Sequence, residues 1–164
     1  MRCTRFLPLG VCLLLAAGAC EPATPVDDWT PLNLLQYEVP ATVLAPAGTN
    51  VRNDNLGILQ DVKLTGEDGY DVQIYASEAL ETDAATVLTD QRQEVESMRY
   101  FADIVEDQPD GFLFRMAVDT ANVSYDFRHV RIIGDRELIF RTGLTRNASE
   151  AEARRMFEAV RYRK

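Results

Sequence analysis

Apolar and polar residues alternate through much of the segment from residue 56 to residue 143, and this pattern constrains the fold more than any other feature of the chain. Successive side chains of a β-strand point to opposite faces, so an apolar residue at every second position gives a strand one buried face. Val62 and Leu64 follow this rule, and so do Val72 and Ile74 on the far side of a glycine-containing loop. The two runs predict a β-hairpin.

Four further strands are expected beyond this hairpin. They cover residues 100–106, 112–118, 123–133 and 137–143. The alternation in the third of them slips near His129 and Val130, which predicts a β-bulge. Upstream of the hairpin, the apolar segment 32–46 is interrupted by Pro40 and Pro46, which favours an edge strand or an extended segment over a central strand.

Two amphipathic helices are expected from apolar residues spaced three and four positions apart. The first covers residues 82–98, and its apolar stripe begins at Leu80. The second begins after Ser149, which forms a capping box with Glu152. Its buried stripe is expected to consist of Ala153, Met156, Phe157 and Val160. The basic residues expected near the negative end of its dipole are Arg161, Arg163 and Lys164.

These elements predict an α+β fold. A mostly antiparallel sheet of about six to seven strands packs with the two amphipathic helices, and the C-terminal helix closes the domain. The helices can cover one face of the sheet or opposite faces. A chain of 164 residues, 46% of them hydrophobic and 26% charged, has room for one such domain over residues 32–164.

The first nineteen residues have the layout of an export signal. Arg2 and Arg5 precede the apolar stretch 6–17, which leads into small residues. A helix that crosses a bilayer needs roughly 20 apolar residues, so this stretch is too short to remain as a membrane span. We expect residues 1–19 to be a signal peptide that is removed.

The residues Ala17, Gly18, Ala19 and Cys20 resemble the lipobox of bacterial lipoproteins, although that family usually has leucine where Ala17 stands. The resemblance implies that a signal peptidase cuts before Cys20, which then carries acyl chains such as palmitate. The protein would thus be lipid-anchored on the extracytoplasmic side of the cell membrane or the outer membrane, facing the periplasm. Residues 20–31, with three prolines, are then expected to be a flexible tether. The alternative is an ordinary signal peptide that leaves Cys20 as a free thiol.

The composition excludes several classes of protein. All three cysteines lie within the first 20 residues, so the rest of the chain cannot build a disulfide framework or a cysteine-based metal cluster. The formal charge of −9 becomes −11 once Arg2 and Arg5 are removed with the signal, which argues against nucleic acid as a partner. The charge is uneven, because residues 21–110 hold 4 basic and 19 acidic residues and residues 111–164 hold 11 and 7.

The order of the expected elements resembles the PsbP-like proteins, which include small bacterial lipoproteins of unassigned role. The segments that carry the resemblance are 45–51 before the hairpin, 70–74 within it and the closing helix 149–164. The resemblance implies an α/β sandwich that serves as an extracytoplasmic accessory or binding module of the cell envelope. It carries no catalytic residues over to this chain.

No catalytic constellation is found in the sequence, and we do not expect an enzyme. His129 is the single histidine; Ser124 and Asp126 lie in the same expected strand, where residues at odd spacing face opposite sides. His129 is therefore expected at a strand surface or in the bulge. The acidic stretch 67–71 lacks the spacing of a calcium loop and is typical of a turn, so neither a metal nor a cofactor is expected.

The last two expected strands carry a group of arginines with aromatic neighbours. This possible face for a partner or an anion consists of Arg128, Arg131, Arg141, Tyr125 and Phe127. A guanidinium group suits carboxylates and phosphates. The alternative is internal pairing of these arginines with nearby acids.

Two functions remain open at this point. The first is a membrane-anchored, non-enzymatic module that binds or supports another component of the cell envelope. The second is a periplasmic carrier or sensor of a small ligand, with a pocket between sheet and helices. A flat exposed patch around Tyr125 and Phe127 would favour the first, and a concave apolar pocket with converging polar groups would favour the second.

Overall fold

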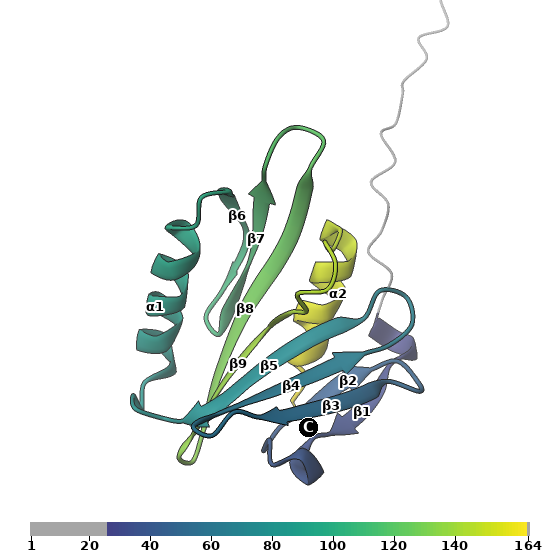
Figure 1. Cartoon of the computed structure of the whole chain (residues 1–164), viewed down its shortest axis with the longest axis vertical. Helices are drawn as coiled ribbons and strands as arrows, with labels where there is room; N and C mark the ends of the chain where they lie inside the picture. The colour runs from purple at the N-terminus through teal and green to yellow at the C-terminus, as the bar shows by residue number, and fades with distance from the viewer. Residues whose placement is uncertain (1–25, 164) are drawn as a thin grey trace, which may run out of the picture.

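The computed structural model describes residues 26–163 and shows the expected α+β architecture. The seven strands of its main sheet are β3 (Asn50–Asn55), β4 (Leu59–Thr65), β5 (Asp71–Glu78), β6 (Phe101–Gln108), β7 (Gly111–Ala117), β8 (Val123–Ile133) and β9 (Arg136–Thr142). Their order across the sheet is β3-β4-β5-β9-β8-β7-β6, and every neighbouring pair is antiparallel (Figure 1). The expected signal peptide and Cys20 lie outside the described residues.

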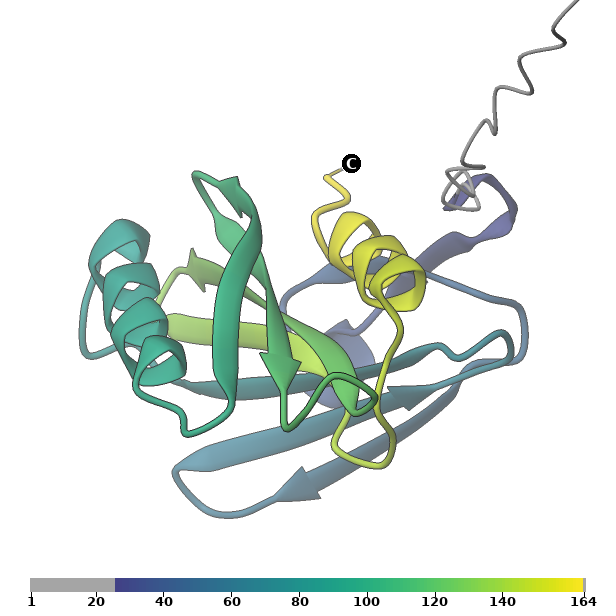
Figure 2. The ribbon, with the colours of Figure 1, turned by 90° about the horizontal axis from the view of Figure 1, so that it is seen from above.

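The two helices pack on opposite faces of the sheet. They are α1 (Ala84–Glu96) and α2 (Glu150–Val160). The core on the α1 side contains Phe112, Phe114 and Val130, whereas Phe157 of α2 belongs to the larger core on the other side. Figure 2 shows the sheet curling so strongly that β6 and β7 stand between the helices. Residues 127–130 of β8 are consequently all buried, because both faces of this strand are covered.

The start of the domain differs from the expectation. In place of one extended segment, the chain forms a short antiparallel sheet of β1 (Thr30–Asn33) and β2 (Thr42–Ala45), flanked by the 3₁₀ turns η1 (Val26–Asp28) and η2 (Leu35–Tyr37). Trp29 lies between η1 and β1 and is only 7% exposed. Its ring meets that of Tyr70 edge-on at 5.0 Å, and the Arg155 guanidinium lies 4.4 Å over it. The folded domain thus begins within the segment that was expected to be a tether up to residue 31.

Several local features of the central region also differ from the expectation. β3 was missed because its sequence is polar, and it is held as the outer strand by its ladder to β4. Leu80 was assigned to the stripe of the first helix, but it lies in the loop before α1 and is 96% exposed. The bulge expected at His129 is absent: β8 pairs with β7 and β9 without a shift in register. Two shifts in register occur instead in β6, where it pairs with β7.

The closing helix follows the expectation. The Ser149 hydroxyl accepts a hydrogen bond from Glu152 N, and the Glu152 carboxylate accepts one from Ser149 N at 2.8 Å, which completes the capping box. The four residues of the expected stripe are buried: Ala153, Met156, Phe157 and Val160. They pack against β8 and β9 on one side and β2 on the other, so α2 links the small sheet to the large one.

Candidate ligand-binding notch beside Arg131

The five residues of the expected partner face are distributed over both sides of the sheet. Tyr125, Phe127 and Arg131 lie on the α2 side, whereas Arg128 and Arg141 lie on the α1 side, because residues at odd spacing along a strand face opposite ways. Phe127 is 0% exposed and packs against Phe157, and Arg128 is 1% exposed. One exposed face built from all five residues is therefore ruled out.

The two arginines on the α1 side are neutralised by one carboxylate. Asp126 Oδ2 accepts hydrogen bonds from Arg128 Nη1 at 2.7 Å and Arg141 Nη2 at 3.2 Å, while Oδ1 accepts from the backbone and hydroxyl of Thr142. Burial opposes the charge of Asp126 most strongly, but the two guanidinium groups and these hydrogen bonds outweigh it and lower the pKa of Asp126. For Arg128 and Arg141, internal pairing is what the structure shows.

His129 lies on the α2 side and is completely buried, not at the surface. Its ring packs beside those of Phe140 and Phe157, at 5.3 and 6.5 Å between centroids. Nε2 accepts a hydrogen bond from Arg131 Nε at 2.9 Å, so Nδ1 carries the proton that is donated to Asp110 O at 2.7 Å. Burial, and then the charge of Arg131, lower the pKa of His129 to about 4.

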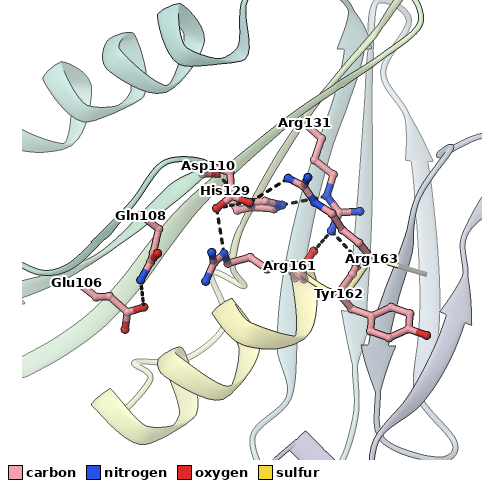
Figure 3. A network of polar contacts seen from close by, with 9 residues as sticks. Glu106, Gln108, Asp110, His129, Arg131, Arg161, Tyr162 and Arg163 are labelled. Carbon is pink, nitrogen blue, oxygen red and sulfur yellow. Dashed lines mark hydrogen bonds and ion pairs between the residues drawn. The ribbon is translucent and has the colours of Figure 1, made fainter.

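Arg131 reaches from β8 to the C-terminal end of α2 (Figure 3). Its Nη2 donates hydrogen bonds to Val160 O and, at 3.0 Å, to Tyr162 O, two carbonyl groups at the negative end of the helix dipole. Among residues 26–163, Arg131 has no carboxylate within ion-pair distance, and its Nη1 makes no hydrogen bond. The guanidinium group therefore retains donors for a further partner.

The basic residues after α2 bind a different target from the one expected. Arg161 Nε and Arg163 Nη2 lie 2.9 and 3.2 Å from the two oxygens of Asp110, which belongs to the turn between β6 and β7 (Figure 3). Arg131 takes the place at the helix end that was assigned to them. Two arginines thus bind Asp110, and Arg131 lies close by without an ion pair to its carboxylate.

A concave site opens beside this network. Its volume is about 490 Å³, and we call it the β8 notch. Its lining residues are Pro40, Ala41, Thr42, Ala84, Pro109, Asp110, Val130, Arg131, Ile132, Ile133, Tyr162 and Arg163. Most of these side chains are apolar, and Asp110, Arg131 and Arg163 supply the charges. A volume of this size and a lining of this kind are typical of small-ligand sites.

The notch exists because β8 is longer than the hairpin beside it. The ladder between β7 and β8 stops at the pair of Gly111 and His129, and one more hydrogen bond follows, from Val130 N to Asp110 O at 3.1 Å. β8 continues to Ile133, paired only with β9 over this last part within the described chain. Residues 131–133, which extend beyond the start of β7 and which we call the overhang, form one wall of the notch.

The sequence did not point to this arrangement. Asp110 lies between the expected strands 100–106 and 112–118 and was given no functional role, and Arg161 and Arg163 were assigned to the helix dipole alone. Of the expected site residues, only Arg131 lines the notch. The one indication in the sequence was the unequal length of the two neighbouring expected strands, 112–118 and 123–133.

The other candidate catalytic and metal-binding side chains do not converge within residues 26–163. Ser124 and Asp126 do not converge with His129, whose two ring nitrogens bond to Asp110 and Arg131. Within this range no group of three or more His, Cys, Asp and Glu side chains could hold a metal ion. None of the helices in the described part of the chain is both long enough and apolar enough to cross a membrane.

Comparison with known proteins adds no further assignment: no protein-family model, curated protein or solved structure matches this chain.

Proposed function

We propose that this chain is an extracytoplasmic lipoprotein, anchored through Cys20, whose domain binds a small organic anion in the β8 notch. The observation that carries the binding role is the position of Arg131: a charged group without a carboxylate partner in the described chain borders a concave, mostly apolar site. Arg163 adds a second positive charge. An anion there would form charge-assisted hydrogen bonds with Arg131 beside a mostly apolar lining.

The alternative role, docking of an envelope protein on an arginine face, loses its main support. The aromatic residue at the centre of that face, Phe127, is buried, and Arg128 and Arg141 are occupied by Asp126. The converging polar groups lie in a concave site instead. The geometry therefore favours a carrier or sensor of a small ligand.

Binding can be tested by methyl NMR on the full chain purified from membranes and placed in phosphatidylcholine nanodiscs. Isoleucine δ1 methyl groups are convenient reporters because Ile132 and Ile133 line the notch, whereas Ile58 and Ile74 lie elsewhere. We expect sodium octanoate, sodium benzoate or N-acetylalanine to shift the first two signals in a saturable manner. Arg131→Gln should abolish the shifts.

The matched control is Arg99→Gln, which alters an exposed arginine outside the notch and should leave binding unchanged. Shifts that persist in Arg131→Gln, or the absence of shifts with all three anions, would contradict the binding role. The anchor is tested separately: Cys20→Ser should abolish both the incorporation of radioactive palmitate and the removal of residues 1–19. A variant that still takes up the label would contradict the lipobox assignment.

A further inference from the structure

The part of β8 that borders the notch has an open strand edge. This edge indicates which class of ligand the notch binds, an inference that rests on the proposed binding role. Val130 N points away from β9, because it donates to Asp110 O. Backbone groups of an antiparallel strand point alternately to its two neighbours, so the N–H and C=O of Ile132 point the same way as those of Val130. They face the line along which β7 would extend if it began before its first residue, Gly111.

Unpaired backbone groups of this kind are a template for another strand. The overhang of residues 131–133 is about 10 Å long, at roughly 3.3 Å per strand residue, which suits two or three residues of an added chain. The walls on the two sides are apolar: Val130, Ile132 and Ala84 stand on the α1 side, with Pro40 and Ala41 opposite. Small apolar side chains pointing alternately to these walls would fill the notch.

Charge distinguishes the two ends of the notch. Arg131 and Arg163 lie at the end next to Asp110, where α2 finishes, whereas the other end is the β8–β9 turn. Asp110 is already bound by Arg161 and Arg163, so the free donors of Arg131 are available to a carboxylate. A chain that continued the line of β7, antiparallel to β8, would bring its C-terminus to this end.

We propose that the β8 notch binds the C-terminal two or three residues of an apolar peptide, which pair with Ile132 as a short added strand and place the free α-carboxylate on Arg131. Recognition of this type combines main-chain hydrogen bonds with capture of a terminal carboxylate. A fatty carboxylate could satisfy Arg131, but it has no N–H or C=O groups to pair with the strand edge. The backbone edge therefore favours a peptide over a lipid.

The test uses the same nanodisc sample and isoleucine reporters with four probes. They are acetyl-Ala-Val-Ala with a free C-terminus, its C-terminal amide, its analogue N-methylated at the valine amide, and sodium octanoate. We expect the free acid to bind about tenfold more tightly than the amide, because the amide loses the charge-assisted contact with Arg131. N-methylation should also weaken binding about tenfold, since it removes a strand hydrogen bond without changing the charge.

Each outcome separates the inference from the role on which it rests. The strand pairing would be overturned if octanoate bound as tightly as the free-acid peptide, or if the N-methylated peptide bound as tightly as its parent. Either result would still leave an anion site at Arg131. Equal binding of acid and amide would overturn the carboxylate contact. If neither the peptides nor the small anions shift Ile132 and Ile133, both proposals fail.

Discussion

Arg131 Nε donates a hydrogen bond of 2.9 Å to His129 Nε2, and this contact joins the buried core to the notch. It requires a neutral imidazole, because a protonated ring has no acceptor. The bond from His129 Nδ1 to Asp110 O holds the other side of the ring. His129 is thus a positioning residue for Arg131, and its protonation would break the contact that orients the guanidinium group.

Acid should therefore weaken the domain through His129. Folding lowers the pKa of His129 from its ordinary value of 6.5 to about 4. The unfolded chain binds the proton more readily, so this contribution to stability is complete above pH 6.5 and is lost as the pH falls toward 4. Between pH 7.5 and pH 5 the loss should be about 2 kcal/mol.

Urea unfolding of the wild type and of His129→Gln at the two pH values measures this loss. The variant should be less stable than the wild type at pH 7.5, but its free energy of unfolding should fall by about 2 kcal/mol less on acidification. The same fall in both proteins would contradict the assignment of the acid sensitivity to His129.

Asp126 should be essential for stability. Asp126→Asn leaves Arg128 buried and Arg141 largely buried without their common carboxylate, and removing one member of a buried ion pair costs about 3–5 kcal/mol. Asp103→Asn is the matched control, since it breaks an ion pair with Arg115 in which both side chains are about half exposed. That change should cost less than about 1 kcal/mol. Equal midpoints for the two variants in urea unfolding would contradict this account.

The cap of α2 should make a smaller, local contribution. Ser149→Ala removes the hydroxyl that accepts from Glu152 N, and loss of such a cap costs about 1 kcal/mol. Thr89→Ala in α1 is the control, because its exposed hydroxyl bonds only to Ala85 O within its own helix. Thermal unfolding should show a lower midpoint for Ser149→Ala than for Thr89→Ala; the reverse order would contradict the capping role.

Local rules explain why some of these elements could be predicted from the sequence. The capping box of Ser149 and Glu152 and the alternation around Val72 and Ile74 each depend on residues a few positions apart, and the structure contains both. β3 could not be found in this way. Its polar side chains give no pattern, and its strand conformation comes from the ladder to β4.

The candidate site depends on contacts between distant parts of the chain. Arg131 meets the end of α2 some 29 residues later, and Arg161 meets Asp110 some 51 residues earlier. Neither partner can be read from spacing along the chain. The burial of Phe127 likewise depends on α2 covering one face of β8 while α1 covers the other. Because β8 is covered on both faces, Phe127 and Arg128 are buried, although the sequence alone suggested that they lie on an exposed face.

The start of the folded domain can be tested at Trp29. The indole is buried between Tyr70 and Arg155, and it fixes η1 and β1 against the end of the large sheet and α2. Trp29→Ala should lower the free energy of unfolding by about 3–5 kcal/mol, as expected when a buried aromatic side chain is truncated. Leu35→Ala is the matched control, because Leu35 lies in the neighbouring turn η2 but is 64% exposed, and surface changes of this kind usually alter stability by less than about 0.5 kcal/mol. A cost below 1 kcal/mol for Trp29→Ala would mean that this segment behaves as the tether predicted from its prolines, whereas the larger cost would show that the cooperative fold includes residue 29.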